Sequence, residues 1–333
     1  YYYCHGKGGG NMKQFMKIFS VALVVFMVIA SVQVYSIYKG ILGANNRVPS
    51  YDENWLSDYQ NDLVTLETYE AYISGGNRVN ILIAGLEDVR TDTIILASYN
   101  IKTKKLDMIS IPRDTYYYKE GFRSGFQYVA NYKINAVYSG HGIEGLIRAV
   151  EDIVNVPIHH YVTVTMTGAE KIVNAMGGVE FDVPFDMKYD DIYDSPPLHI
   201  DLKAGPQVLD GKNAVDFLRF RKNNDGTISY GDIQRIEQQQ NFLAAAAKQA
   251  FGIRFPLVVK EVFDAVKTDV KLSEAITYAT STIGIKSENI SFYTLPGNAE
   301  YMQGVSFYMV NGIEMQKIIY GIYNIPFEKA TGN

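Results

Sequence analysis

Hydrophobic and polar positions from residue 79 onwards follow two alternating patterns. Short apolar runs typical of buried strands cover Val79–Leu86, Asp92–Tyr99, Lys105–Ile111, His160–Met166, Val179–Val183 and Ile290–Leu295. Apolar residues at helical spacing predict helices over 142–154, 167–175, 212–217, 232–250, 255–266, 273–283 and 311–320. Because strands alternate with helices, we expect residues 79–333 to form a single layered α/β domain.

A long apolar run near the start of the chain interrupts this scheme. Residues 18–38 contain no charged side chain, and 21 residues of helix span about 30 Å, the thickness of the hydrocarbon core. Lys13 and Lys17 precede the run, whereas the following segment is acidic. The pattern predicts one transmembrane helix with residues 1–17 in the cytoplasm and the rest outside the cell. A cleaved signal peptide is the alternative interpretation.

The segments on either side of this run have different characters. Residues 1–11 lack a structural pattern, and Met12-Lys13 resembles a natural start, so we interpret residues 1–11 as a tag or a start-site error. Residues 39–78 are polar and acidic. We expect them to form an extracytoplasmic stalk that is partly helical over residues 54–72.

Composition narrows the possible classes of protein. The 333 residues are 47% hydrophobic and 20% charged, as in ordinary globular domains. A net charge of −5 argues against a protein that coats nucleic acid. One cysteine excludes a disulfide scaffold and a cysteine-based zinc site. For an exported domain, the absence of disulfides points to a Gram-positive envelope.

A first cluster of charged residues follows the first predicted strand. Glu87, Asp88, Arg90 and Asp92 lie between two buried strands, and ligand sites of α/β sheets lie in such loops. Closely spaced carboxylates suit a hard divalent cation such as Mg²⁺ or Mn²⁺. A solvated acidic turn is the alternative.

Two further clusters have a similar character. Arg113 and Asp114 directly follow an apolar strand and Pro112, where a structural ion pair is the alternative to a site. If the segment around Arg219 and Arg221 is extended, both guanidinium groups point to the same face.

The helix predicted after Arg221 presents three polar residues on one face. Asp232, Arg235 and Gln239 have the spacing i, i+3 and i+7, and the first turns of a helix favour an anion. An N-cap role for Asp232 and a solvated side chain for Arg235 are the alternatives.

Arginine usage links these clusters. The chain has only ten arginines, and five of them lie here: Arg90, Arg113, Arg219, Arg221 and Arg235. Arginine suits bidentate recognition of phosphate or carboxylate. Several arginines beside a cation held by carboxylates would suit a pyrophosphate.

The order and spacing of several motifs resemble those of the LytR-CpsA-Psr family of cell-wall glycopolymer ligases. The matching segments are NILIAGL (80–86), R-x-D-T (90–93), SIPRDT (110–115), KINAVYSGHG (133–142), HHYVTVTM (159–166), AMGGVEFDVP (175–184), FLRFR (217–221) and D-x-x-R-x-x-x-Q (232–239). The resemblance implies an α/β/α domain with a central mixed sheet. It also implies a tunnel for a polyprenyl chain between the sheet and the helices.

The resemblance assigns roles to the charged residues. Arg90, Arg113, Arg219, Arg221, Arg235 and Gln239 would hold the pyrophosphate. Asp92, assisted by Glu87, would hold Mg²⁺, and Asp232 would support the site. The family commonly has Asp where this chain has Glu87. It also often has Arg where this chain has Gln238.

The activity that the resemblance implies is transfer of an undecaprenyl-pyrophosphate-linked glycopolymer to peptidoglycan at the membrane. A muramic acid hydroxyl would attack the sugar-side phosphorus, with Asp92 or Asp114 orienting or deprotonating it. Two alternatives stay open: a lipid-pyrophosphate hydrolase, and a non-catalytic, membrane-anchored regulator or wall-binding module. No helix-turn-helix pattern supports contact with DNA.

Overall fold

The computed structural model describes residues 66–75, 77–87, 90–118, 131–194, 197–229, 232–250 and 255–326. Side chains of residues 66–68, 232–236 and 255–257 lie outside this description. The chain divides into two compact units, residues 1–48 and 49–333, and every described residue belongs to the second unit. The predicted transmembrane helix over residues 18–38 therefore lies outside the described residues. Among those that are described, no helix is both long and apolar enough to cross a bilayer.

A six-stranded mixed sheet forms the centre of the domain, with the strand order β10-β3-β2-β1-β4-β9. Its strands are β1 (Arg78–Glu87), β2 (Arg90–Asn100), β3 (Lys105–Ile111), β4 (His160–Thr165), β9 (Lys267–Thr268) and β10 (Ile290–Thr294). β1 pairs antiparallel with β2 and parallel with β4, and β3 pairs antiparallel with β2 and parallel with β10. The expected α/β fold with a central mixed sheet is confirmed.

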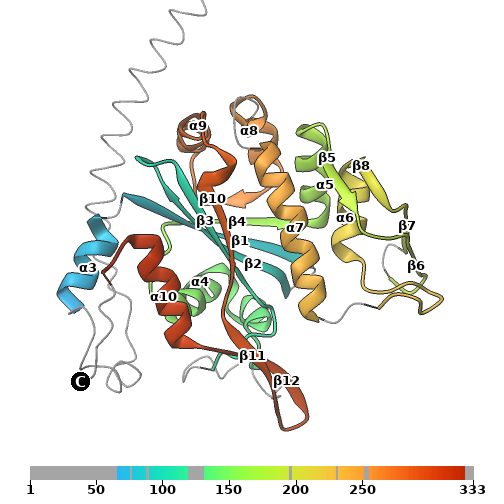
Figure 1. Ribbon diagram of the computed structural model, residues 1–333, viewed down its shortest axis with the longest axis horizontal. Helices are drawn as coiled ribbons and strands as arrows, with labels where there is room; N and C mark the ends of the chain where they lie inside the picture. The colour runs from blue at the N-terminus through green and yellow to red at the C-terminus, as the bar shows by residue number, and fades with distance from the viewer. Residues whose placement is uncertain are drawn as a thin grey trace, which may run out of the picture. The chain divides into compact units, whose positions relative to one another are not determined.

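Helices cover both faces of this sheet (Figure 1). They are α3 (Leu66–Gly75), α4 (Ile134–Val154), α5 (Met166–Ala175), α6 (Gly211–Arg219), α7 (Asp232–Ala250), α8 (Phe255–Asp264), α9 (Leu272–Ser281) and α10 (Gly312–Tyr323). On one face, Leu82, Leu96 and Ile109 pack with Leu146 of α4 and Ile319 of α10. Alternate residues of the same strands form the opposite apolar face, as the pleat requires.

A smaller core lies beside the sheet, where two short antiparallel strand pairs pack on α6 and α7. The pairs are β5 (Val179–Val183) with β8 (Gly205–Leu209), and β6 (Met187–Asp191) with β7 (Leu198–Leu202), which form a hairpin between β5 and β8. Phe217 and Phe220 meet Phe242 of α7 in this core, and all three side chains are buried. The aromatic contacts fix the end of α6 against α7.

The sequence predicted five of the six strands of the central sheet and most helices but missed six strands in all. Strands β6, β7, β8 and the short β9 were not predicted, nor was the hairpin of β11 (Gly297–Met302) and β12 (Val305–Val310). The predicted helix over residues 142–154 begins earlier, at Ile134, with a kink at Gly142 where φ is +63°. Of the helix predicted over residues 54–72, residues 66–72 are described and lie in α3, which continues to Gly75, and residues 54–65 lie outside the described residues.

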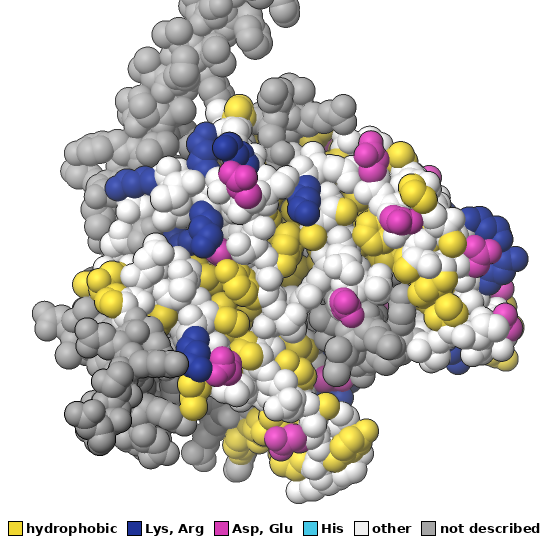
Figure 2. Space-filling view, in the orientation of Figure 1, with side chains coloured by type: hydrophobic (Ala, Val, Ile, Leu, Met, Phe, Trp, Pro, Cys, Tyr) yellow, Lys and Arg dark blue, Asp and Glu magenta, His cyan; other side chains and the backbone are white. Residues whose placement is uncertain are grey.

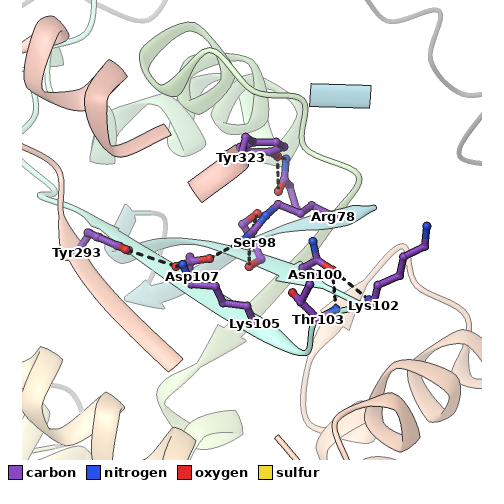
Figure 3. A network of polar contacts seen from close by, with 10 residues as sticks. Arg78, Ser98, Asn100, Lys102, Thr103, Lys105, Asp107, Tyr293 and Tyr323 are labelled. Carbon is purple, nitrogen blue, oxygen red and sulfur yellow. Dashed lines mark hydrogen bonds and ion pairs between the residues drawn. The ribbon is translucent and has the colours of Figure 1, made fainter. Parts of the chain in front are cut away.

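A buried ion pair is the centre of the polar network in Figure 3. Arg78 Nη2 lies 2.7 Å from Asp107 Oδ2, and the two side chains are 3% and 0% exposed. Arg78 also donates to the carbonyl of Ser98 at 3.0 Å and lies 5.5 Å from the ring centre of Tyr323. The hydroxyl of Tyr293 donates to Asp107 Oδ1 at 3.4 Å. The network joins β1, β2 and β3 to β10 and α10.

Asp107→Asn is expected to lower the free energy of unfolding by about 3–5 kcal/mol, because it leaves the Arg78 charge buried without its partner. Urea denaturation measures the change. The control is Asp264→Asn, whose carboxylate pairs with Lys260 on the surface of α8 and whose loss should cost less than about 1 kcal/mol. Equal losses for the two variants would contradict the prediction.

Candidate functional site at one edge of the sheet

Strand direction brings distant parts of the chain to one edge of the sheet. β1 and β3 both run antiparallel to β2, so their carboxyl ends lie at the same edge. Glu87 ends β1, and Arg113 and Asp114 follow the last residue of β3. Ligand sites in α/β folds commonly lie outside the carboxyl ends of strands. The first two charged clusters of the sequence therefore meet.

A β-bulge sets the position of Asp92. Gly85 pairs with Thr93 and Leu86 pairs with Thr91, so Asp92 is the additional residue in the β1–β2 ladder. Bulges commonly re-aim a side chain next to a functional site. Here the inserted residue is the carboxylate that the sequence singles out.

Asp92 forms an ion pair with Arg113. Arg113 Nη1 lies 2.6 Å from Asp92 Oδ1, and the two side chains are 24% and 20% exposed. A tight turn holds Arg113, because the N–H and the hydroxyl of Thr115 both donate to the carbonyl of Pro112, at 3.0 and 2.6 Å. The guanidinium is thus positioned by backbone geometry at the end of β3.

A hydrogen bond links the carboxyl groups of Glu87 and Asp92 and shifts their pKa values in opposite directions. A hydrogen bond to Asp92, burial and the negative charge of Asp92 together raise the pKa of Glu87 to about 7, against the opposing charges of Arg219 and Arg221. Burial also favours a higher pKa for Asp92, but hydrogen bonds from Glu87 and Arg113 outweigh it and hold that pKa below its usual value. Asp92 is therefore the charged member of the pair at neutral pH, and Glu87 titrates close to it.

Arg219 reaches the same pair from the other core. It is the last residue of α6, and Phe220 directly after it is extended, with φ −60° and ψ 133°. The expectation that Arg219 and Arg221 share an extended segment is therefore wrong for Arg219, because the buried face of α6 extends the helix to this residue. Arg219 Nη2 lies 3.5 Å from Glu87 Oε1 and pairs with Asp194 Oδ2.

The other predicted site residues differ in how closely they approach this cluster. Arg221 is exposed, and its charge lowers the pKa of both acidic side chains. Arg90 is exposed and lies opposite Glu87 in the ladder. The side chains of Asp232 and Arg235, in the first turn of α7, lie outside the described residues.

A pocket beside the Asp92–Arg113 pair has walls from three parts of the fold. The α7 helix contributes Gln239, Gln240 and Leu243, and the β11–β12 hairpin contributes Phe307 and Tyr308 among others. Gln239 is anchored, because its Nε2 donates to the carbonyl of Leu218 at 2.9 Å. The fixed amide ties α7 to the segment that ends in Arg219.

Asp114 lies in the same pocket wall and faces a lysine. Lys133 Nζ, just before α4, lies 3.1 Å from Asp114 Oδ1 and 5.8 Å from the ring centre of Phe307. The N–H of Tyr308 donates to the carbonyl of Asp114 at 2.9 Å. The hairpin and the start of α4 therefore fix the second candidate base.

Sequence reasoning missed three contributors to the site: Lys133, Asp194 and the β11–β12 hairpin. Lys133 opens a segment quoted for the family resemblance, so its position was available from the sequence although its role was not. Asp194 belongs to an acidic stretch that had no distinguishing pattern. Only the tertiary fold brings it to Arg219.

These contacts define a cleft that can bind an anion and a cation side by side. Guanidinium groups bind phosphate oxygens, whereas two neighbouring carboxylates can hold a divalent cation or take up a proton. Within the described residues, no group of three or more His, Cys, Asp or Glu side chains is arranged to hold a metal ion alone. The geometry defines an α/β domain with a charged cleft whose chemistry suits a phosphate-type ligand.

The chain belongs to the LytR_cpsA_psr family, whose model matches residues 42–322. It is 28% identical over 300 residues to polyisoprenyl-teichoic acid–peptidoglycan teichoic acid transferase TagV of Bacillus subtilis (strain 168), covering 87% of this chain and 72% of that protein. It is 30% identical to the TagU transferase of Oceanobacillus iheyensis, covering 72% and 73% of the two chains. The crystal structure of B. subtilis TagV superposes with a TM-score of 0.63 at 26% identity, covering 75% of this chain and 97% of that chain.

Asp194→Asn is expected to tighten binding of a soluble short-chain probe, geranyl pyrophosphate, about two- to five-fold, because it removes a carboxylate that competes for Arg219. Isothermal titration calorimetry measures the affinity. Asp191→Asn is the control, since Asp191 ends β6 three residues before Asp194 and accepts hydrogen bonds from Tyr189 and Tyr193 instead. Weaker binding by Asp194→Asn would show that Asp194 orients Arg219 rather than competing for it.

Proposed function

We propose that this protein transfers a glycopolymer of the teichoic acid or capsule class from an undecaprenyl-pyrophosphate carrier to peptidoglycan. The product is a phosphodiester, and undecaprenyl phosphate is released. Family membership and the names of the TagV and TagU relatives support the reaction class.

The observation that carries the proposal is the meeting of Arg113, Arg219, Asp92 and Glu87 at one edge of the sheet. Two guanidinium groups from separate cores can contact the oxygens of one diphosphate. Their positive charge stabilises the transition state most, because negative charge develops on these oxygens during phosphoryl transfer. At present these groups are paired with carboxylates. A bound diphosphate would take over part of that pairing.

An apolar surface next to the site suits the lipid part of the donor. Leu243 lines the site pocket and also packs against the cluster formed by Ile95, Met108 and Ile290 on the sheet. In Figure 2, hydrophobic side chains come to the surface along this side of the molecule. We propose that the polyprenyl chain lies between the sheet and α7, with its pyrophosphate at the arginines.

A divalent cation fits the acidic pair. Mg²⁺ is commonly held by one or two carboxylates together with substrate phosphates and water, so a two-carboxylate site is sufficient. We propose that Asp92 and Glu87 hold Mg²⁺ or Mn²⁺ in place of the hydrogen bond that links them. When bound, the cation would neutralise charge on the diphosphate.

The residues of this chain would orient the two reacting partners. The acceptor hydroxyl, which we propose to be the muramic acid C6-OH, attacks the sugar-side phosphorus. The bond from that phosphorus to the bridging oxygen breaks, and the hydroxyl proton passes to a carboxylate. Asp92, beside Arg113, and Asp114, beside Lys133, are the two candidate acceptors of that proton.

The proposed reaction takes place at the outer surface of the cell membrane. We propose that residues 18–38 anchor the chain as a single-pass helix with its N-terminus in the cytoplasm. The catalytic domain then lies beside the leaflet that contains the lipid-linked donor. Protease added to intact protoplasts would digest the domain if this orientation holds.

Arg113→Ala and Arg219→Ala are each expected to lower the rate of transfer at least about 100-fold, because each removes a donor to the charged transition state. Transfer of a lipid-pyrophosphate-linked oligosaccharide to isolated glycan strands measures the rate. Arg148→Ala is the control, since Arg148 is exposed on α4 and its Nε donates to the carbonyl of Glu144 in the same helix, at 3.3 Å.

The same assay separates transfer from hydrolysis. Product attached to glycan strands supports the proposal, whereas free phosphorylated oligosaccharide formed equally with and without strands supports a hydrolase. Full transfer by both arginine variants would refute the proposed role of the site, and absence of transfer by the wild type would support the non-catalytic interpretation.

Removal of divalent cations with a chelator is expected to lower transfer, and added Mg²⁺ should restore it. Asp92→Asn should abolish that restoration, because it removes the carboxylate that stays charged, and Glu87→Gln should weaken it less. The measurement is the rate as a function of Mg²⁺ concentration. A rate that is insensitive to the chelator would rule out the proposed cation site.

A further inference from the structure

The edge of the sheet opposite the candidate site carries a group of lysines. β1 begins and β2 ends at this edge, and the turn between β2 and β3 follows. β10 runs parallel to β3, so the segment between α9 and β10 reaches the same edge. The lysines of the turn and of this second segment are Lys102, Lys104, Lys105 and Lys286. We name residues 101–105 and 283–286 together the lysine surface.

Hydrogen bonds hold the two segments of the lysine surface in place. Lys104 Nζ donates to the carbonyl of Ile283 at 2.5 Å, which joins the turn to the second segment. Asn100 Oδ1 accepts the N–H groups of Lys102 and Thr103, at 3.0 and 2.9 Å, and so fixes the turn. In Figure 3, the Lys102 side chain extends from this turn away from the buried polar network. The lysine surface is therefore a fixed part of the fold.

The lysine surface is positive, whereas the whole chain has a net charge of −5. Two carboxylates beside it leave most of this charge in place. Asp107 is buried and already paired with Arg78 at 2.7 Å, and Lys105 lies 3.6 Å from it. Glu288 lies 3.5 Å from Lys286, but the two side chains are 72% and 73% exposed, so water weakens the pair. In Figure 2, Lys and Arg side chains gather over the region of α9 and the neighbouring strand ends.

Apolar side chains accompany these lysines. Ile283 is 40% exposed, and Ile101 and Ile285 are half-buried. Both half-buried isoleucines pack against the apolar cluster that also includes Leu243, which lines the site pocket. The strands that carry this cluster are about 30 Å long, at 3.3 Å per residue. The lysine surface and the site pocket therefore lie at opposite ends of one apolar layer.

We propose that the lysine surface docks on an anionic lipid bilayer, so that the candidate site faces away from the bilayer at a height of about 30 Å. Ammonium groups bind the phosphates of anionic lipids, and apolar side chains at the same level enter the interface. The described chain also enters the sheet at this edge, because the N–H of Ile101 donates to the carbonyl of Asn77, just before β1, at 3.3 Å. The inference rests on the proposed location of the domain at the outer surface of the membrane and adds its orientation.

This orientation gives each proposed substrate its own approach. A polyprenyl chain that leaves the bilayer would enter the apolar layer beside Ile101 and Ile285. Its pyrophosphate would reach Arg113 at the far edge of the sheet. The peptidoglycan acceptor would arrive from the side away from the bilayer, where the site pocket lies.

The test measures which edge of the full-length protein lies at the lipid. Cys4→Ser removes the single cysteine of the chain, so a fluorophore can be attached at one new cysteine. Thr103→Cys places it on the lysine surface, and Ser229→Cys places it at an exposed position in the segment after Arg221. The protein is held in nanodiscs of phosphatidylcholine and phosphatidylglycerol that contain a lipid with a nitroxide on its head group. We expect quenching at Thr103→Cys to be several-fold stronger than at Ser229→Cys, and to fall without phosphatidylglycerol or at high salt.

Two double variants test whether the lysines cause this docking. Lys102→Glu with Lys286→Glu reverses two charges of the lysine surface and should remove most of the quenching at Thr103→Cys. Lys171→Glu with Lys188→Glu is the matched control, since these exposed lysines lie on α5 and β6. The control should retain the quenching. All four side chains are exposed, so circular dichroism and thermal unfolding should match the wild type for both double variants.

Several results would overturn the proposal. Equal quenching at the two labelled positions would do so, as would equal quenching in the two double variants or quenching that does not depend on phosphatidylglycerol. If soluble poly(glycerol phosphate) shielded the Thr103→Cys label from iodide while the nitroxide lipid left it unquenched, the surface would bind an anionic polymer instead. Nanodiscs expose both faces of the bilayer and the readout needs no catalysis, so this proposal and the proposed function can fail separately.

Discussion

The candidate site depends on strand direction in the middle of the sheet. β2 runs antiparallel to both of its neighbours, so the ends of β1 and β3 lie at one edge and carry Glu87 and Arg113 to within reach of the same carboxylate. The bulge before Glu87 completes this arrangement by turning Asp92 out of the regular ladder. A shift of one residue in this register would exchange the two faces of the strand and disperse the charged groups.

The balance of charges in the cleft follows from the same geometry. A partly buried guanidinium group is stabilised by an ion pair with a carboxylate. Arg113 pairs with Asp92, and Arg219 pairs with Asp194. These pairs position the guanidinium groups, yet their half-buried setting leaves them open to exchange with another anion. The hydrogen bond between Glu87 and Asp92 reduces the repulsion that two adjacent carboxylates would otherwise suffer.

The sequence predicted the site best where charged residues end strongly apolar strands. Burial of those strands determined the fold, and their direction then fixed where Glu87 and Arg113 lie. The prediction of an extended backbone at Arg219 was wrong. The local sequence pattern is similar for a strand and for the end of a helix, and the packing of Phe217 against Phe242 decides between the two. Sequence reasoning also missed Asp194 and the β11–β12 hairpin, since short hairpins have weak periodicity and their neighbours are set by tertiary contacts. Roles for Arg235 and Asp232 stay predictions, as their side chains lie outside the described residues.

The placement of β1 has a mechanical consequence. This strand follows α3 almost directly and is hydrogen-bonded along its length by β2 and β4. Tension applied to the polypeptide ahead of α3 would thus load the β1–β2 and β1–β4 hydrogen bonds in shear at the same time. The buried ion pair of Arg78 and Asp107, at the start of β1, would be the first contact to resist. Such a pull would be borne along the direction of the strands, while Glu87, at the far end of β1, keeps its place.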